Sequence, residues 1–577
     1  MKWTFTSDPA KDAPEIQALA KAIGLSLPAT RVLWSRGHRT IEDARRFFSP
    51  TLEDLHPASL LKDIDKAVDR LHRAITTKEK ILLYGDYDVD GTSAVVVLKK
   101  GIELLGGEVS FHVPHRLRDG YGMRNEAVED AQAAGVTLIV SVDTGIRANA
   151  VVEHASTLGI DVIVTDHHLP EAELPPAVAV LNPNRPDCDY PEKNLCGAGV
   201  AFKLMDALAI RFGWEGAKRA KLLDSFLKIV AIATVADVVP LVGENRVIVK
   251  RGLEGLNEVR NPGLRALLDV AGFPVDKAPP TASQVAFQVA PRINAAGRMA
   301  SASDVIEMFL TSDVARAKEL AEQLHALNKD RQQTEAEIAQ SILKICTEVP
   351  VTDNDTALVF AGDNWHRGVV GIVASRVVEK YHRPVFILSI EEGIAQGSGR
   401  SISAFHLLEA MESMPELFSK FGGHRQAAGL TMDAANVDTF RQRLQAYAAE
   451  RLTPADFERE LMIDGEIEFK EISDASILEI LRLAPFGMGN PAPTFVLRNV
   501  EVAAPPDIKN EKHIFARFRQ AGKMLRAKAW NFADRAAEFA PGTLVDLAVQ
   551  FEDDSYSAQR GYAPWQTIIR DVRPASN

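Results

Sequence analysis

The 577-residue chain has little cysteine, no long apolar run and no excess of basic residues. Its three cysteines, Cys188, Cys196 and Cys346, are too few and too scattered for a disulfide framework, and no Cys-x-x-Cys pair indicates a zinc site. No apolar run is long enough to predict a membrane span, and the N-terminal segment MKWTFTSDPAKDAPE lacks the apolar core of a secretory signal. These absences favour a reduced, cytoplasmic compartment.

The net charge is −12, with 66 basic against 78 acidic side chains. As an average over the chain, this charge argues against a nucleic-acid partner. Whether the protein binds nucleic acid therefore depends on whether basic residues cluster locally. The length predicts about three or four domains.

A rhythm of apolar runs and helical patterns extends from residue 80 to about residue 240. Strands are predicted at 81–83, 109–113, 136–142, 160–164 and 177–181. This alternation is typical of a mostly parallel sheet with helices on both faces, and such sheets bind ligands beyond the carboxyl ends of their strands. Before it, residues 1 to about 75 are predicted to form packing helices, at 16–23, 40–48 and 64–75.

Acidic and imidazole side chains follow three of the predicted strands and one later apolar helix. They are Asp86, Asp88, Asp90, Asp143, Asp166, His167, His168 and Asp237. The first three alternate just before a helix expected to start at Thr92 or Ser93, and like charges this close repel unless a cation sits among them. Considered alone, Asp143 could equally be a helix-cap or turn residue, and the two histidines could be loop residues. Their coincidence at one sheet edge favours Mn²⁺ or Mg²⁺.

A long helix and a second α/β segment are predicted next. Residues 312–346 contain no Gly or Pro, and their polar middle at 328–335 suggests a helix that bridges two domains rather than one buried in a core. Two glycine-rich turns are expected after it. The turn at 397–401 would cradle a phosphate with Arg400 and Ser401 just before a helix, and the turn at 421–429 contains His424.

The C-terminal segment, from about residue 456, reads as short strands, at 494–502, 513–519, 524–530, 544–551 and 567–572. Five such strands suit a small β-barrel of the OB type. Strand alternation puts the side chains of two neighbouring strands on one face, namely Phe515, Arg517, Arg519, Arg526, Lys528 and Trp530. Cations interleaved with aromatics suit single-stranded nucleic acid, and the alternative is a solvated face with two core aromatics.

Several segments resemble known families. GDYDVDGT at 85–92, VDTG at 142–145, TDHH at 165–168 and ATVADVVPL at 233–241 resemble the four motifs of the DHH phosphoesterase superfamily. PHRLRDGYG at 114–122, PRINAAGRM at 291–299 and PFGMGNPAP at 485–493 resemble the RecJ family, and GGHRQAAG at 422–429 resembles the histidine motif of a DHHA1 domain.

The resemblance implies an α/β protein in which a parallel-sheet DHH domain is joined by a long helix to a smaller α/β DHHA1 domain, followed by an OB-like β-barrel. The implied boundaries are an N-terminal helical segment at 1–50, the DHH domain at 51–311, the connecting helix at 312–346, the DHHA1 domain at 347–455 and the barrel at 456–577.

The implied activity is that of a metal-dependent 5′→3′ exonuclease, which hydrolyses single-stranded DNA to 5′-mononucleotides in DNA repair and recombination, with two Mn²⁺ or Mg²⁺ ions. The implied metal ligands are Asp88, Asp90, Asp143, His167 and Asp237, with Asp143 between the two ions. Where relatives carry a histidine this chain has Tyr84, so Asp86 either substitutes as a ligand or lies behind the ligands. Asp166 would orient His167 or His168, His168 would lie near the scissile phosphate, and His424 would add positive charge.

The remaining implied residues contact DNA. The candidates for holding a 5′-phosphate are Arg116, Arg292, Arg298, Arg400 and Ser401, and Asn294 is a further phosphate or DNA contact. An inter-domain salt bridge is the alternative for Arg292 and Arg298. The resemblance also suggests a single-strand-binding protein and a helicase as partners, a monomer and no membrane. The rival functions are a phosphodiesterase or pyrophosphatase for small substrates and a non-catalytic DNA-binding scaffold.

Overall fold

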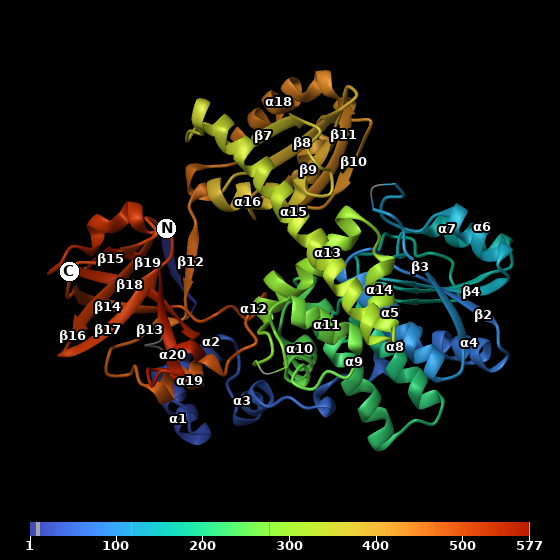
Figure 1. Ribbon diagram of the computed structural model, residues 1–577, viewed down its shortest axis with the longest axis horizontal. Coiled ribbons are helices and arrows are strands. Elements are labelled where there is room, and N and C mark those ends of the chain that lie inside the picture. Colours follow the sequence, from blue (N-terminus) through green and yellow to red (C-terminus); the bar gives the residue numbers. More distant parts are fainter. Residues whose placement is uncertain (7–11, 117, 276, 576–577) are drawn as a thin grey trace. The chain divides into compact units, whose positions relative to one another are not determined.

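The computed structural model describes residues 1–6, 12–116, 118–275 and 277–575, and the chain forms two compact units (Figure 1). Unit 1 contains Met1–His56, Val238–Arg251 and Glu460–Asn577, and unit 2 contains Pro57–Asp237 and Gly252–Arg459. Within the described ranges, no helix combines the length and apolar character needed to cross a bilayer.

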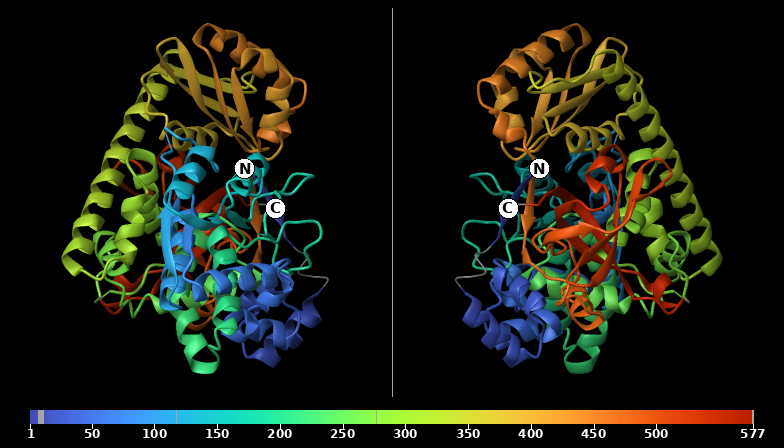
Figure 2. Two further views of the ribbon diagram at one scale, coloured as in Figure 1. Left: turned by 90° about the vertical axis from the view of Figure 1, so that its right-hand side faces the viewer. Right: turned by 90° about the vertical axis from the view of Figure 1, so that its left-hand side faces the viewer.

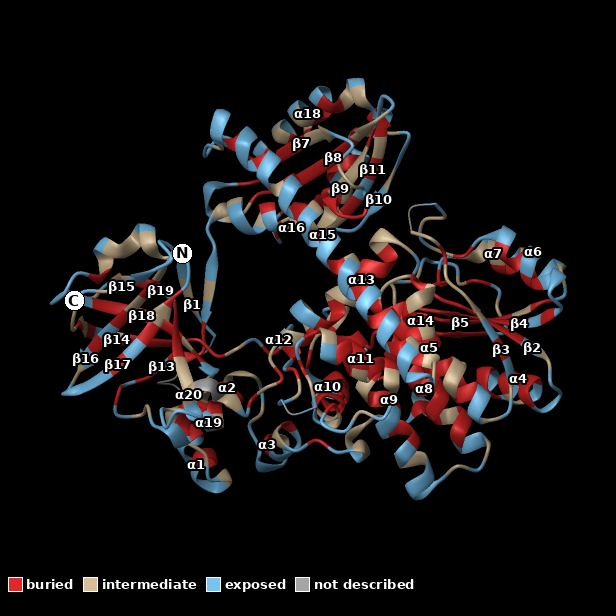
Figure 3. Cartoon of the chain, in the orientation of Figure 1, coloured by how far each residue is buried: buried red, intermediate tan, exposed pale blue. Residues whose placement is uncertain are grey.

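A fully parallel sheet in the order β3–β2–β4–β5–β6 opens unit 2. Its strands are β2 (Lys80–Tyr84), β3 (Glu108–His112), β4 (Val136–Val142), β5 (Asp161–Thr165) and β6 (Ala179–Leu181). The central strands are almost entirely buried, as Figure 3 shows. This confirms the expected parallel sheet and places the carboxyl ends of β2, β4 and β5 next to one another.

Helices cover both faces of this sheet. On one face, α6 (Asn125–Ala133) and α7 (Asn149–Thr157) share an apolar core with β2, β4 and β5. The other group is α4 (Ile64–Thr76), α5 (Val89–Leu104) and α8 (Gly197–Arg211), which pack on one another (Figure 1). Further helices of unit 2 are α9 (Gly216–Ala236), α11 (Pro262–Val270), α12 (Ala282–Gln284), a π-helical turn (Val285–Val289), α13 (Ala290–Met299) and α14 (Ser303–Leu310). Helix α10 (Gly243–Gly255) begins in unit 1.

Helix α5 begins earlier than the sequence predicted. Its first residue is Val89, and Asp88 is the N-cap, whose side chain accepts a hydrogen bond of 3.0 Å from the Gly91 N–H. The expected start at Thr92 or Ser93 was wrong because an aspartate can cap a helix and a second can lie in its first turn. Asp90 therefore lies inside the helix.

The long helix α15 (Val314–Glu348) has 35 residues. Figure 2 shows it as one continuous helix. It packs on α11, α13 and α14, and its later residues Ile338 and Ile342 join the core of the second sheet. The expectation for its polar middle was wrong in one respect, because Asn328, Arg331 and Glu335 are only 4, 7 and 1 % exposed. Arg331 bonds to both neighbours, at 3.0 Å to Asn328 Oδ1 and 2.7 Å to Glu335 Oε2, so these buried polar groups are paired.

The second sheet of unit 2 has the order β10–β11–β9–β8–β7, in which only β7 and β8 are parallel. Its elements are β7 (Leu358–Asp363), α16 (Val370–Tyr381), β8 (Val385–Glu391), β9 (Ile394–Arg400), α17 (Leu407–Glu412), β10 (Lys420–Gly423), β11 (Ala427–Asp433) and α18 (Val437–Ala449). The predicted turn at 397–401 is wrong, because residues up to Arg400 belong to strand β9. A Cβ on Gly399 would clash with the Phe386 ring, so this glycine serves close packing rather than a turn.

Unit 1 contains a closed five-stranded barrel, with β14–β18–β19–β17–β16 completed by the pairing of β16 with β14. This confirms the expected OB-like barrel. Its strands are β14 (Phe495–Val502), β16 (His513–Gln520), β17 (Lys523–Ala529), β18 (Leu544–Asp553) and β19 (Trp565–Pro574). Shorter elements are β12 (Glu460–Ile463), β13 (Gly465–Glu466), α19 (Asp474–Leu481), β15 (Asp507–Lys509) and α20 (Ser555–Ala558).

The N-terminal helices share the core of this barrel. The elements at this end of the chain are β1 (Lys2–Phe5), α1 (Ala13–Ile23), α2 (Leu27–Ser35) and α3 (Ile41–Phe48). Side chains from α2 and α3, such as Leu33 and Phe47, pack in one cluster with Phe495 and Phe518 of the barrel. The expected helices at 16–23 and 40–48 are confirmed, whereas β1, α2 and the shared core were not predicted.

Candidate metal centre and anion site

The ends of β2, β4, β5 and α9 bring acidic and imidazole side chains together in unit 2. Within each of three overlapping groups, the candidate ligand atoms lie within 4.8 Å of one another. The groups are Asp86, Asp88 and Asp143; Asp90, His167 and Asp237; and Asp143, His167 and His168. Because Asp143 and His167 each belong to two groups, the arrangement suits two neighbouring ions.

Helix α8 approaches two of the carboxylates with its N-terminus. The N–H groups of Gly197 and Ala198 donate to the two Asp90 carboxylate oxygens, at 2.5 and 2.8 Å. Gly197 is required there because a Cβ would lie 2.6 Å from the Asp143 Cβ. The partial positive charge of the helix end offsets part of the repulsion between Asp90 and Asp143.

Three carboxylate oxygens of the cluster are buried without a hydrogen-bond partner in the described part of the chain. They are Asp86 Oδ1, Asp143 Oδ1 and Asp237 Oδ2. Buried acceptors left unpaired cost free energy, and a divalent cation satisfies them. Carboxylate oxygens with one or two imidazole nitrogens form a donor set that fits Mn²⁺ or Mg²⁺.

The carboxylates raise one another's pKa. Burial first, and neighbouring aspartates second, raise the pKa of Asp86 and Asp143 well above the usual range. The same causes raise the pKa of Asp237 to about 9. Without a cation the cluster therefore holds protons that metal binding would displace.

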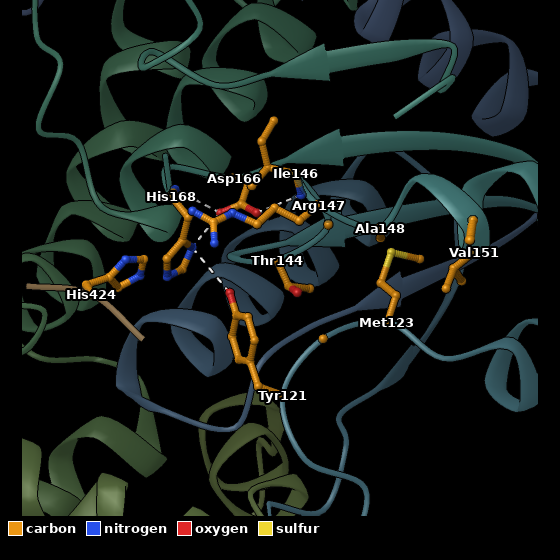
Figure 4. A pocket seen from close by; sticks show the side chains of 13 residues that line it. Tyr121, Met123, Thr144, Ile146, Arg147, Ala148, Val151, Asp166, His168 and His424 are labelled. Atoms are coloured by element: carbon orange, nitrogen blue, oxygen red, sulfur yellow. Dashed lines mark hydrogen bonds and ion pairs between the residues drawn. The ribbon is translucent and has the colours of Figure 1, made fainter. Parts of the chain in front are cut away.

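The pKa values of the two histidines are shifted in opposite directions. Burial lowers the pKa of His167, which leaves a neutral imidazole suited to ligation, with its Nε2 3.2 Å from Asp143 Oδ1. For His168, burial is outweighed by a hydrogen bond of 2.7 Å between its Nδ1 and Asp166 Oδ1, which raises its pKa (Figure 4). Asp166 also accepts the Ile146 N–H at 2.9 Å, so it orients His168 rather than His167.

Tyr84 takes no part in the cluster. Its ring is fully buried, and its hydroxyl donates to the Gly122 carbonyl at 3.1 Å. Asp86 instead lies with Asp88 and Asp143. The structure thus places the carboxylate, and not the tyrosine, among the candidate ligands.

Three arginines gather without a carboxylate. No ion pair involves Arg116, Arg298 or Arg400 in the described ranges of the chain. Burial first, and then the charges of Arg116, Arg331 and Arg400, lower the pKa of Arg298 to about 9. Asp88 acts electrostatically on Arg298, and Arg116 acts on Asp86. Guanidinium groups that form no close ion pair in the described ranges fit a phosphate, which two or more forked donors can hold.

Single contacts fix these arginines. Arg298 Nη1 donates to the Gly368 carbonyl at 3.0 Å, and the Arg116 guanidinium lies 4.9 Å from the Tyr87 ring centre. Arg400 Nη1 donates to Ser398 Oγ at 2.8 Å. Ser398 is therefore the hydroxyl beside the arginine, and sequence reasoning missed it because the strand was read as a turn.

Other predicted phosphate contacts have different roles. Arg292 bonds to Gln288 and to His325 Nδ1, so the salt bridge considered for it is not seen among the described residues. Asn294 Oδ1 accepts the Val89 N–H at 3.3 Å and so supports the start of α5. Ser401 Oγ donates to the Phe405 carbonyl at 3.1 Å, which directs it away from Arg400.

A cavity of about 370 Å³ lies beside His168 and His424 (Figure 4). Tyr121, absent from the predicted set although its motif was noted, places its hydroxyl 3.3 Å from both the Asp143 carbonyl and His168 Nδ1. Burial, and then Arg147 and His168, lower the pKa of His424. This lowered pKa favours the neutral imidazole of His424 in the absence of substrate.

The predicted basic face lies on β16 and β17 in unit 1. Arg517 stands directly opposite Arg526, and Phe515 opposite Lys528, whose Nζ lies 5.7 Å from the Phe515 ring centre. The Trp530 ring packs edge-on against Phe515 at 6.1 Å. Arg519 differs from its neighbours because it pairs with Glu501 at 2.6 Å.

Comparison with known proteins first defines the class. Residues 80–234 match the model of the DHH family N-terminal domain, residues 354–450 match the DHHA1 domain, and residues 463–571 match the RecJ OB domain. The chain is thus a protein of the DHH–DHHA1 class that carries an OB domain.

Full-length comparisons identify the family. The chain is 35 % identical over 578 residues to the single-stranded-DNA-specific exonuclease RecJ of Bacillus subtilis, covering 99 % of this chain and 71 % of that protein. It is 39 % identical to the protein of that name from Salmonella typhimurium, covering 94 and 95 %. The chain belongs to the RecJ family.

Solved structures agree with this assignment. The crystal structure of Thermus thermophilus RecJ with Mn²⁺ matches with a TM-score of 0.84 and 31 % identity, over 100 % of this chain and 80 % of that one. The structure of the same protein with Mg²⁺ matches with a TM-score of 0.78 and 29 % identity, over 100 and 79 %.

The raised carboxyl pKa values predict how metal-free protein responds to pH. Asp237 has a folded-state pKa of about 9 against about 3.9 when unfolded, so its contribution to stability is fully present below the lower value and is lost as pH rises through the higher one. The thermal unfolding midpoint of chelator-treated protein should therefore decrease as the pH is raised from about 6 to about 8.5. Excess Mg²⁺ should stabilise the protein more at the higher pH, because its ligands must be deprotonated. Asp237→Asn should reduce this pH dependence, and a Mg²⁺ effect that is equal at both pH values would contradict the metal assignment.

Proposed function

We propose that the chain is a metal-dependent exonuclease that degrades single-stranded DNA from its 5′ end and releases 5′-mononucleotides. The observation that carries the proposal is the position of Asp143, which two ligand groups share, in a cluster whose Asp86 and Asp88 interact electrostatically with Arg116 and Arg298. The names of the relatives and the ions in two neighbouring structures support it. A role in DNA repair and recombination follows as part of the proposal.

Two of the ligand groups would each hold one ion of the metal centre. Asp86, Asp88 and Asp143 would hold one ion, and Asp90, His167 and Asp237 the other. Two bound divalent ions would supply a water of lowered pKa and stabilise charge on the attacking and leaving oxygens.

Protein groups complete the reaction site. His168, kept protonated by Asp166, would donate a hydrogen bond to a phosphate oxygen as it gains negative charge. Tyr121 would hold His168 in place through its hydroxyl. Neutral His424, across the same cavity, would act as a second hydrogen-bond donor.

Direction of attack follows from the arginine cluster. Arg116 acts electrostatically on Asp86 of the metal centre and on Arg400, so the cluster and the metal centre are close neighbours. A 5′-phosphate held by Arg116, Arg298, Arg400 and Ser398 would place the first phosphodiester at the ions. The aromatic and basic face on β16 and β17 would bind the strand further along, which a small-substrate enzyme does not need.

The organisation and setting of the protein are part of the same proposal. We keep the division into segments 1–50, 51–311, 312–346, 347–455 and 456–577. We propose that the protein is a cytoplasmic monomer. We also propose that its partners are a single-strand-binding protein and a helicase, as expected from the family.

The direct test is digestion of single strands labelled at either end, with Mn²⁺ present. The 5′ label should appear first as a mononucleotide, and duplex and dinucleotide controls should be poor substrates. Asp143→Ala removes an oxygen shared by two ligand groups, so activity should fall by at least about a hundredfold while the circular dichroism spectrum is kept. First release from the 3′ end, or preference for dinucleotides, would contradict the proposal.

The anion site predicts a dependence on the terminal phosphate. Arg400→Ala should raise KM for 5′-phosphorylated strands by about tenfold to a hundredfold, because a charge-assisted hydrogen bond contributes about 1.5–3 kcal/mol. KM for 5′-hydroxyl strands should change little. Ser401→Ala is the matched control, since its hydroxyl bonds to Phe405. An equal rise in KM for 5′-phosphorylated and 5′-hydroxyl strands would indicate that Arg400 supports folding rather than binding of the terminal phosphate.

The barrel predicts a salt-dependent contact with long strands. Arg517→Ala and Arg526→Ala should each weaken binding of long single strands and lower the slope of log K against log[salt] by about 0.7. Arg519→Ala should have a smaller effect, because its charge is already paired with Glu501. Unchanged salt slopes in fluorescence titrations would exclude this face as the DNA track.

A further inference from the structure

The cavity of about 370 Å³ in unit 2 continues beyond the groups that act on the scissile phosphate (Figure 4). His168 and His424 line one end of it, and the apolar side chains of Met123 and Val151 line the other. Its volume falls in the range of about 300–1,000 Å³ that is typical of small-molecule sites. The cavity can therefore hold a further group of the substrate besides the phosphate at the ions.

Arg147 is an exposed cation on the wall of this cavity. Its guanidinium is held from one side, where Nε and Nη2 donate to the Leu169 carbonyl at 3.1 and 3.0 Å. Among the described residues, Arg147 has no carboxylate in an ion pair, and its Nη1 has no hydrogen-bond partner. Its charge reaches the reaction site, since it lowers the pKa of His424. The guanidinium is thus fixed in direction and still offers a donor to a ligand.

The acidic side of the cavity is already satisfied. Asp166 is the one carboxylate among the described residues that line it. This side chain is fully buried, and its oxygens accept the Ile146 N–H at 2.9 Å and bond to His168 Nδ1 at 2.7 Å. No lining acid in the described ranges is therefore left for a cationic ligand, whereas Arg147 is available to an anion. The charge of the cavity favours a negatively charged ligand.

The remaining wall is apolar. Met123 and Ile146 are only 8 and 2 % exposed, and Val151, in the first turn of α7, is partly buried. Apolar walls with a few polar groups are the usual form of a pocket that orients a small ligand. A nucleotide combines the flat face of a base with a charged phosphate, so it matches both the apolar wall and Arg147.

We propose that the cavity binds the second nucleotide of the strand, and that Arg147 binds the phosphate that follows this nucleotide. The scissile phosphate precedes the second nucleotide and would lie at the ions and His168, so the sugar and base would enter the cavity from that end. The inference rests on the proposed exonuclease function. It adds a substrate contact beyond the metal centre and the arginine cluster.

The first test compares a 5′-phosphorylated trinucleotide with a 5′-phosphorylated dinucleotide in Mn²⁺. The dinucleotide has only the scissile phosphodiester, whereas the trinucleotide has a second one for Arg147. The kcat/KM of wild-type protein should be higher for the trinucleotide, and Arg147→Ala should lower the ratio of the two values by about tenfold. Arg147→Lys should recover part of the ratio, because it keeps the charge but loses the fork. Lys221→Ala is the matched control, since Lys221 is exposed on α9 and does not line the cavity.

A change in the substrate separates phosphate binding from support of the His168 loop. Arg147 also holds the Leu169 carbonyl, and loss of that support alone would lower kcat for both strands alike. A neutral methylphosphonate at the second phosphodiester should raise KM about tenfold for wild-type protein and less than twofold for Arg147→Ala. An equal loss for dinucleotide and trinucleotide in Arg147→Ala, or an unchanged methylphosphonate effect, would overturn the proposal.

Binding measurements in Ca²⁺, which also takes carboxylate oxygens as ligands, do not depend on cleavage. The affinity for a dye-labelled trinucleotide should fall more when the second nucleotide is abasic than when the first is. A larger loss for the first nucleotide would place the terminal base in the cavity and overturn the assignment. If wild-type protein bound the trinucleotide about tenfold more tightly than Arg147→Ala but degraded no strand in Mn²⁺, the proposed function would be wrong and the subsite would stand.

Discussion

Repulsion among buried carboxylates is the constraint on which unit 2 depends. Adjacent parallel strands deliver aspartates to one sheet edge, and burial then makes each negative charge costly to its neighbours. The fold meets part of this cost with the α8 N-terminus, which bonds to Asp90. The rest is left to cations. The guanidinium groups of the arginine cluster likewise repel one another. Bound cations would reduce the repulsion among the carboxylates, and the negative charge of a DNA phosphate would reduce the repulsion among the arginines.

Much of this arrangement could be predicted because two periodic patterns are strong. Alternating apolar runs and helices define the parallel sheet. Because the carboxyl ends of parallel strands meet at one edge of the sheet, Asp143 and His167 could be predicted to lie together. The predictions failed where one residue type serves two purposes. Gly399 was read as a turn glycine but packs within a strand. The polar stretch at 328–335 was taken as evidence against burial in a core, but Arg331 and Glu335 satisfy each other on a buried helix face.

Details of the site depended on contacts between distant segments, which a single sequence does not reveal. Ser398 rather than Ser401 lies beside Arg400, and this follows only once strand alternation is known. The lowered pKa of His424 arises from burial and from Arg147 and His168, which lie far away along the chain, Arg147 in the turn before α7. The sequence likewise does not reveal that Tyr84 lies outside the metal centre, because this follows from the hydrogen bond of its hydroxyl to the Gly122 carbonyl.

The shared core of the N-terminal helices and the barrel has a consequence for synthesis on the ribosome. Strand β1 pairs with β12, and Trp3 donates a hydrogen bond to Asp571, near the other end of the chain. Strand β1 and Trp3 therefore wait for β12 and Asp571 to be made before unit 1 can close. At about 5–20 residues per second, that wait lasts on the order of half a minute to two minutes. During this interval, the apolar sides of α2 and α3 lack their barrel partner, and unit 2 has its full sequence available to fold only after Arg459 has been made.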